Sequence, residues 1–258
     1  MDQARVVKSD YEVRMIRRAN DVSSAAHRKV AENFLSLTNE RDIEAIHLAV
    51  CTARGTNAQA YPIIAGAGTN GATLHYFANN TPLAGKETIV VDAGCEWNCY
   101  ASDITRTFPI PGTWSPRPAR IHKLVERMQD ACISRIQPGV IFFQLHLLAM
   151  DIAMKGLLEL GILKGEEKQV AEAGTIAAFF PHGLGHHVGL EVHDVSGYER
   201  LMLMAETGSR LDGGKRRLIT PNMLSSMSGI SKMTASKPPY SGRQELQPNM
   251  IVTVEPGM

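Results

Sequence analysis

Apolar residues recur with the 3.6-residue period of a helix near the start of the chain. On one face of residues 9–36 lie Tyr11, Met15, Ala19, Val22 and Ala26. Ser9 is a good N-cap, and Glu12 follows it at the spacing of a capping box. The pattern predicts a long amphipathic helix over residues 9–36.

Three later stretches show the same period and predict further helices. They cover residues 43–49, 119–136 and 143–160. The first closes at Gly55, the second stops at Pro138-Gly139 and the third at Gly161. The polar residues of the last two helices do not converge on one point, so we interpret both helices as scaffold.

Short apolar runs broken by glycine replace the helical period after Ala60. Residues 61–68 predict a strand that leaves through a glycine loop. Residues 89–94 and 100–106 are rich in β-branched side chains and predict two strands joined as a hairpin.

Each strand of this hairpin carries one carboxylate. With a two-residue turn at Trp97-Asn98, Asp92 would lie directly opposite Asp103. Opposed side chains in a sheet have Cβ atoms about 4.5–5.5 Å apart, and two like charges there repel each other. Two divalent ions roughly 3.5–4 Å apart, as in two-metal hydrolytic sites, would offset that repulsion. The alternative is a solvent-facing hairpin whose two acids share no role.

Four of the nine histidines lie within residues 180–194. They are His182, His186, His187 and His193. Glycines between them disfavour a helix, so His182 and His186 are not a zinc-binding pair one helical turn apart. We expect a glycine-bent strand, with a bulge that lets His186 and His193 face one site. A solvent-exposed, pH-sensitive patch is the alternative.

The C-terminal part of the chain has two regions of different character. Residues 199–245 are rich in Gly, Ser, Pro and Met and predict a long insertion, with a short helix near residues 221–227. Residues 247–257 are again β-branched and predict a strand that ends in the carboxylate of Glu255.

Composition is that of a soluble globular protein. The 258 residues are 44% hydrophobic and 21% charged, and residues 1–258 can form a single domain. A formal net charge of +1 gives no basic surface of the kind that binds nucleic acid or an anionic membrane, so we expect neither partner. The charged N-terminus is unlike a signal peptide, and no apolar run is long enough to span a bilayer.

The four cysteines favour a reducing compartment. Cys51, Cys95, Cys99 and Cys132 lack CxxC spacing and form no obvious disulfide framework. We expect reduced thiols in a cytoplasmic protein. A disulfide or a soft-metal site at Cys95 and Cys99 is the alternative.

Four motifs combine in chain order. They are Val91-Asp92-Ala93-Gly94, Ser102-Asp103-Ile104-Thr105-Arg106, His182-Gly183-Leu184-Gly185-His186 with Val192-His193-Asp194, and Thr253-Val254-Glu255-Pro256-Gly257. Together they resemble the metal-binding motifs of the Xaa-Pro peptidases, aminopeptidase P and prolidase, which are relatives of methionine aminopeptidase and creatinase. The resemblance covers nearly the whole chain. It implies an α+β pita-bread fold, in which two pseudo-symmetric halves with a curved, mainly antiparallel sheet covered by helices enclose a dinuclear site. The segment before Glu255 resembles the insertion of the fungal-type branch.

The resemblance implies a ligand set for two Mn²⁺ ions per chain. Asp92 would bind one ion, Asp103 would bridge both, and His186 and Glu255 would bind the other. Carboxylate-rich sites favour manganese over zinc.

The same resemblance assigns the substrate-handling residues. His75, His182 and His193 match family histidines that line the substrate pocket and stabilise the intermediate. Glu255 would also take the proton of the attacking water. His187 matches no functional position and is interpreted as structural.

We expect two parts of the family architecture to be absent. The first helix begins close to Met1, where the family usually has a preceding domain, and a bridging glutamate expected beyond Glu255 would lie past Met258. We therefore expect the final strands to be missing and the second metal site to be weakened. The chain would be a truncated form or a mis-predicted gene product with impaired activity.

The implied activity is metal-dependent hydrolysis of the peptide bond before a penultimate proline, which releases the N-terminal residue of Xaa-Pro peptides. One alternative is a prolidase, which accepts only Xaa-Pro dipeptides. Another is a truncated, non-catalytic pita-bread module that binds peptides or proteins. The expected partner is a proline-containing peptide or dipeptide, and the sequence leaves a homodimer open.

Overall fold

The computed structural model describes residues 1–198, 201–202 and 243–258. These residues belong to two compact units, Met1–His122 with His187–Val195, and Lys123–His186 with Ser196–Met258. The predicted insertion over residues 199–245, including its short helix, lies almost wholly outside the described residues. In the described part of the chain, no helix combines the length and apolar character needed to cross a membrane.

Two N-terminal helices of the first unit follow the predicted pattern. They are α2 (Asp10–Asn33) and α3 (Glu40–Ala53), with a 3-10 turn η1 (Phe34–Ser36) after α2, whereas the short helix α1 (Asp2–Val6) was not predicted. The predicted capping box of Ser9 and Glu12 begins α2, and Asn39 and Asp42 form a second one at α3. The predicted helix over residues 9–36 is confirmed, with its last turn in 3-10 form.

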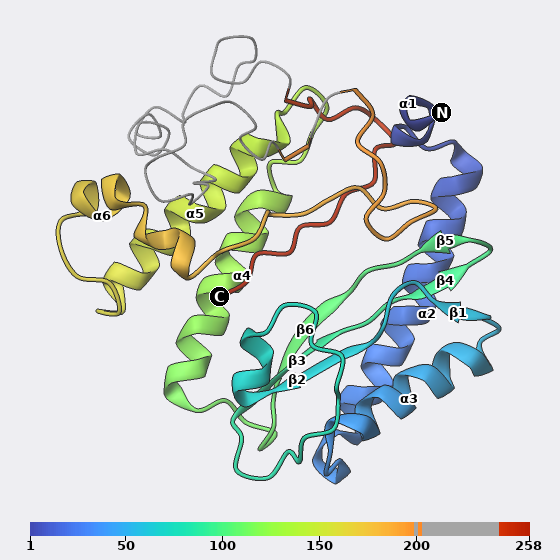
Figure 1. The fold of residues 1–258 in the computed structure, drawn as a ribbon, viewed down its shortest axis with the longest axis horizontal. Coiled ribbons are helices and arrows are strands. Elements are labelled where there is room, and N and C mark those ends of the chain that lie inside the picture. The colour runs from blue at the N-terminus through green and yellow to red at the C-terminus, as the bar shows by residue number, and fades with distance from the viewer. Residues whose placement is uncertain (199–200, 203–242) are drawn as a thin grey trace. The chain divides into compact units, whose positions relative to one another are not determined.

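Six short strands form two antiparallel sheets in this unit (Figure 1). The strands are β1 (Ala58–Gln59), β2 (Ile64–Ala67), β3 (Thr88–Asp92), β4 (Cys95–Trp97), β5 (Tyr100–Ala101) and β6 (Thr105–Pro109), and a 3-10 turn η2 (Gly68–Ala72) follows β2. Their orders are β1-β4-β5 and β2-β3-β6. Helices α2 and α3 pack on each other, and the core between helices and sheet includes Val30, Ile43, Ala65 and Val91.

The predicted register of the hairpin is wrong. Asp92 pairs with Thr105, two residues beyond Asp103, and Trp97 pairs with Tyr100. The turn is therefore Asn98-Cys99, and both residues adopt positive φ angles, 48° and 68°. Such angles give the type I′ turn that matches the twist of paired strands. The turn lies one residue later than assumed, so every pair is displaced by two.

A buried carboxylate fixes the long loop after β2. Glu40, in the first turn of α3, accepts hydrogen bonds from the backbone N–H groups of Ala67 (2.8 Å) and Thr81 (2.9 Å). The Tyr76 hydroxyl (2.9 Å) and the Asn70 amide (3.0 Å) also donate to it. Burial alone would raise the pKa of Glu40, but these hydrogen bonds together lower it below its usual value. The loop that they hold contains His75.

We expect Glu40→Gln to lower the free energy of unfolding at pH 7 by about 1–3 kcal/mol, because buried donors lose a charged acceptor. The ionised carboxylate stabilises the fold fully above its unfolded-state pKa of about 4.3, and this contribution is lost as the pH falls through the lower folded-state pKa. Urea unfolding of both proteins at pH 7 and at pH 3–4 measures the difference. Glu32→Gln, at an exposed position, is the matched control. If the difference in free energy of unfolding between Glu40→Gln and the unmodified chain did not become smaller at low pH, the stabilising role of the ionised Glu40 carboxylate would be contradicted.

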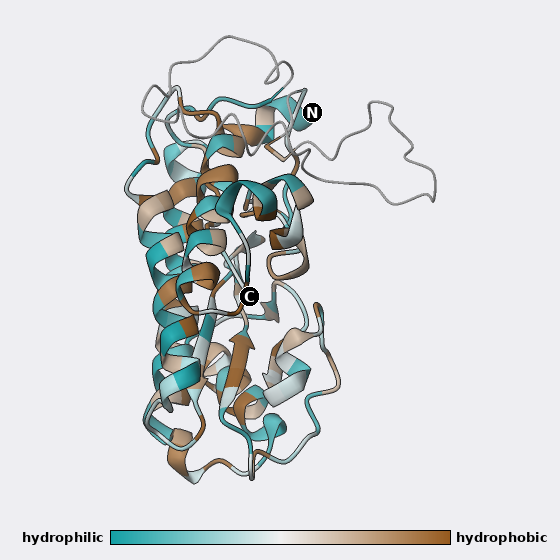
Figure 2. Cartoon of the chain, turned by 90° about the vertical axis from the view of Figure 1, so that its left-hand side faces the viewer, coloured by the Kyte–Doolittle hydropathy of each residue, from teal (hydrophilic) through white to brown (hydrophobic). Residues whose placement is uncertain are grey.

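The second unit is mainly helical among its described residues. It contains α5 (Phe142–Glu159), α6 (Glu167–Ala173) and a 3-10 turn η3 (Thr175–Ala178), while α4 (Pro116–Ile133) runs across the boundary between the units. The two predicted helices over residues 119–136 and 143–160 are thus confirmed. Teal and brown alternate along the long helices in Figure 2, as expected for amphipathic helices.

Neither of the two C-terminal strand predictions gives a regular ladder. In the histidine-rich stretch only an isolated bridge, His187 to Asp194, is formed, and residues 247–257 contain single bridge positions. Two backbone hydrogen bonds join the stretches within the second unit, from Thr253 to His186 and from Glu255 to Leu184, both 2.9 Å long. Glycines and prolines interrupt both segments, so pairing is confined to these short contacts.

Candidate metal centre

Two carboxylates of the first unit converge on one phenol. Asp92 ends β3, and Asp103 lies in the irregular residues between β5 and β6. The Tyr61 hydroxyl lies 2.5 Å from Asp92 Oδ1 and 3.0 Å from Asp103 Oδ1, and the hydrogen bonds join it to both. The two acids are therefore neighbours, as predicted, although they are not direct partners in the sheet.

Gly94 permits this arrangement. A Cβ atom at Gly94 would collide with the backbone carbonyl of Ser102, so the chain on either side of the turn can approach only where a side chain is missing. The Ala93 N–H also donates to the Ile104 carbonyl at 3.1 Å. This close backbone contact brings Asp103 beside the end of β3.

Tyr61 was not identified as a site residue from the sequence. Burial, followed by the negative charges of Asp92 and Asp103, raises the pKa of its phenol well above the usual value, so the hydroxyl keeps its proton. A tyrosine three residues before a strand gives no sequence signal for this role. Only the folded chain places its hydroxyl between two acids that are 11 residues apart.

Without metal, we expect Tyr61→Phe to destabilise the chain by about 1–3 kcal/mol, because two close carboxylates lose their shared donor. Divalent cations at the same carboxylates should remove most of this difference. Urea unfolding with and without Mn²⁺ measures both effects, and Tyr11→Phe on the exposed face of α2 is the control. Equal stability of Tyr61→Phe and the unmodified chain in the absence of metal would contradict the role.

In the second unit, an imidazole and a carboxylate face each other. His186 Nε2 lies 3.1 Å from Glu255 Oε1. Thr253 connects the two residues, because its hydroxyl accepts a hydrogen bond from the backbone N–H of His186 at 2.9 Å and donates one to Glu255 Oε1 at 2.8 Å. Gly185 allows the contact, since a Cβ atom there would collide with the Thr253 carbonyl. Thr253 is a second supporting residue that sequence reasoning missed.

Two of the three predicted pocket histidines belong to the first unit and the third belongs to the second unit. His75 and His193 belong to the first unit, where their ring centroids are 6.4 Å apart, and His75 also stacks on Phe77. His75 has a φ of 57°, a conformation that only a few per cent of non-glycine residues adopt. His182 belongs to the second unit and packs edge-on against Phe180. The first unit thus brings together one pair of the predicted pocket residues.

The second unit also contains a buried histidine that packs against Phe180, the ring that His182 contacts. His146 on α5 is buried between the rings of Phe143 and Phe180. Burial first, and then the positive charges of His182 and Arg243, lower its pKa to about 3. His146 is therefore neutral at physiological pH.

Residues 14–258 match metallopeptidase family M24. The chain is 63% identical over 263 residues to a probable Xaa-Pro aminopeptidase of Metarhizium acridum, and 50% identical over 260 residues to one of Aspergillus niger. Both alignments cover 100% of this chain, but only 51% and 49% of the relatives. The chain thus spans about half the length of the curated relatives it matches.

Solved structures give the same result. Zinc-substituted E. coli aminopeptidase P in complex with product matches with a TM-score of 0.79 and 29% identity, over 98% of this chain and 48% of that one. A His243Ala variant of the same E. coli protein matches with the same TM-score and 28% identity. The α+β prediction is confirmed, and the chain belongs to metallopeptidase family M24, with the pita-bread fold of that family.

Proposed function

We propose that this chain carries the catalytic region of a metal-dependent aminopeptidase that hydrolyses the bond before a penultimate proline. The observation that carries the proposal is the convergence of Asp92 and Asp103 on the Tyr61 hydroxyl. Close carboxylates repel unless cations or protons lie between them, and this chain belongs to a metallopeptidase family. The curated relatives named above are probable Xaa-Pro aminopeptidases.

The residues that would hold the two ions are Asp92, Asp103, His186 and Glu255. Three carboxylates and one imidazole form a hard donor set, which supports manganese as the metal. Tyr61 and Thr253 would orient these ligands through the hydrogen bonds described above, as outer residues do at other metal sites.

Divalent ions held by this set supply Lewis-acid activation of water and of the scissile carbonyl. Glu255 would accept the proton of the attacking water and pass it to the leaving amine. The pocket histidines His75, His182 and His193 would hydrogen-bond the substrate and the negative charge that develops on its carbonyl oxygen.

We also infer a cytoplasmic location. Cys51, Cys95 and Cys132 are free thiols in the interior, and free interior thiols suit a reducing compartment. Fluorescence microscopy of the tagged protein tests the location, and a secreted protein would contradict it.

Metal stoichiometry and peptide cleavage on one purified sample test the proposed function. We expect manganese binding by elemental analysis, with the second ion bound more weakly than the first because only Asp92 and Asp103 would hold it, and a slow Mn²⁺-dependent release of alanine from Ala-Pro-Ala that a chelator abolishes. Cleavage of Ala-Pro without Ala-Pro-Ala would assign the chain to the dipeptidase type instead. Absence of both metal and cleavage would overturn the proposal.

A further inference from the structure

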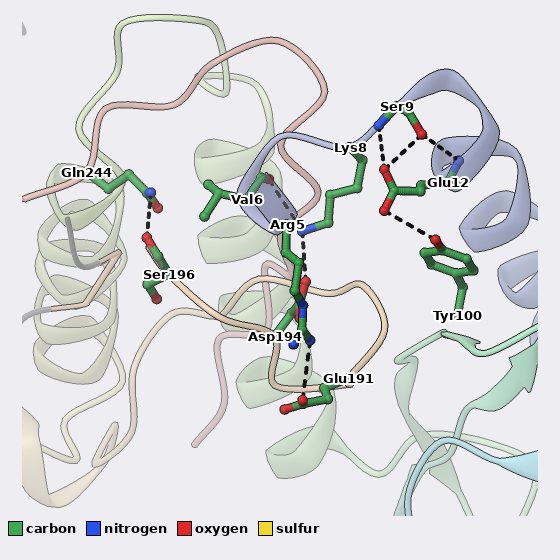
Figure 3. Close-up of polar contacts among 10 residues, drawn as sticks. All are labelled: Arg5, Val6, Lys8, Ser9, Glu12, Tyr100, Glu191, Asp194, Ser196 and Gln244. Atoms are coloured by element: carbon green, nitrogen blue, oxygen red, sulfur yellow. Dashed lines mark hydrogen bonds and ion pairs between the residues drawn. The ribbon is translucent and has the colours of Figure 1, made fainter. Parts of the chain in front are cut away.

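A buried ion pair lies at the N-terminal end of the first unit. Lys8 Nζ is 3.1 Å from Asp194 Oδ2, and each side chain is only 1% exposed. The Arg5 guanidinium contacts the other oxygen of Asp194 and lies 3.3 Å from Glu191 Oε1 (Figure 3). One carboxylate therefore pairs with two cations, and one of these pairs is excluded from water.

Such a pair is a poor source of stability. Removing two charges from water costs about as much as their attraction returns, and apolar residues of similar size often serve equally well. Buried pairs are better known for selecting one arrangement among several similar ones. Lys8 and Asp194 would therefore select one conformation of the loop that contains Asp194.

Asp194 anchors the loop of residues 187–195. Backbone hydrogen bonds in the loop run from Asp194 N–H to the His187 carbonyl and from Ala101 N–H to the Gly189 carbonyl, both at 2.9 Å, and from Gly189 N–H to the Glu191 carbonyl at 3.0 Å. The Asp194 carboxylate lies directly against Gly189, where a Cβ atom would collide with it. The carboxylate thus fills the inside of the loop and ties it to Lys8.

Lys8 is itself attached to regular structure. It immediately precedes Ser9, whose N–H and hydroxyl donate to the Glu12 carboxylate at 2.7 and 2.8 Å. Tyr100 on β5 donates to the other oxygen of Glu12 at 3.2 Å (Figure 3). Lys8 therefore directly precedes the capping box of Ser9 and Glu12, which fixes the backbone at the start of α2.

His193 is the residue adjacent to this anchor. We propose that Lys8, with Arg5, is a positioning residue that acts through Asp194 to hold His193 beside His75. The role of His193 toward substrate rests on the proposed function, but the anchoring of the loop does not. The consequence is that the far N-terminus of the chain helps to shape the pocket.

The main test is the double variant Lys8→Met with Asp194→Asn, which removes both buried charges and leaves Arg5 its pair with Glu191. We expect amide hydrogen exchange in residues 187–195 to increase by about tenfold or more, while α2 keeps its protection. The ¹³Cε1 signal of His193, assigned with His193→Ala, should shift. Exchange within about twofold of the unmodified chain, with an unshifted His193 signal, would overturn the proposal.

Two further variants keep the test decisive. Arg5→Met leaves the buried pair intact and should increase exchange in the same loop by about threefold, so it reports even where the double variant fails to fold. The exposed pair Lys29 and Glu32, changed to Met and Gln, is the matched control and should leave the loop unchanged. If the Lys29/Glu32 double variant increased amide exchange in the loop as much as the Lys8/Asp194 double variant does, the proposal would also be overturned.

Kinetics separate the anchor from the proposed function. The double variant should lower kcat/KM on an Xaa-Pro peptide by about tenfold or more, but by less than about twofold in a His193→Ala background, because coupled residues are not additive. Equal losses in both backgrounds would mean that the pair acts on the whole fold rather than through His193. An inactive unmodified chain would contradict the proposed function, while hydrogen exchange would still decide the anchoring.

Discussion

Replacing Asp103 by asparagine should lower kcat on a proline-containing peptide by about a hundredfold to a thousandfold, the range seen when one preorganised electrostatic group is lost. The amide keeps the size of the side chain but removes one negative charge of the proposed ligand set. Asp103 belongs to the proposed ligand set, so the bound manganese should fall as well. Elemental analysis and a coupled assay of released amino acid measure the two effects on the same sample.

Stability should move in the opposite direction in the absence of metal. Asp103→Asn relieves the repulsion between Asp103 and Asp92, and the Tyr61 hydroxyl can still donate to Asp92. The metal-free variant should therefore unfold at the same or a higher urea concentration. The exposed Asp21→Asn on α2 is the control for loss of one charge. Full manganese occupancy with unchanged turnover would exclude Asp103 from the site.

Gly94→Ala should cause the largest loss of stability, about 3 kcal/mol or more in the free energy of unfolding. The added methyl group would collide with the Ser102 carbonyl, which is backbone and cannot rotate away as a side chain can. Relief requires the strands to separate, so Asp92 and Asp103 should also lose their common contact with Tyr61. Urea unfolding measures the first effect and manganese titration the second.

A second glycine provides the comparison. Gly85 has a φ of 75°, but nothing lies within 4 Å of a Cβ atom built on it. Gly85→Ala should therefore cost only about 1–2 kcal/mol, from backbone strain alone. Gly94 is not among the glycines with a positive φ, so a loss at Gly94 no larger than that at Gly85 would contradict the role of the close Ser102 contact.

Local signals were sufficient for the four long helices, but not for the short helices α1 and α6. The period of apolar residues and the Ser9–Glu12 capping box located α2, because both depend on residues within one or two turns of each other. Asp92 was correctly expected near Asp103, since a hairpin brings its two strands together whatever the exact turn.

The register of that hairpin was not accessible in the same way. Its turn contains Cys99 at a φ of 68°, a conformation for which cysteine has no preference. The contact between Gly94 and the Ser102 carbonyl, which sets the final position of Asp103, joins backbone atoms eight residues apart. Propensity describes single residues, so it cannot specify such a contact.

The sequence by itself determined the long helices, the α+β class, the family and the acids proposed as metal ligands, because these follow from local periodicity and from short motifs. Tertiary structure alone decided which partners support them. Tyr61 lies 31 and 42 residues from its two acids, Thr253 lies 67 residues from His186, and Lys8 lies far from Asp194 in the chain. Hydrogen bonds and ion pairs depend on distances of about 3 Å, and only packing of the whole core sets distances between such remote residues.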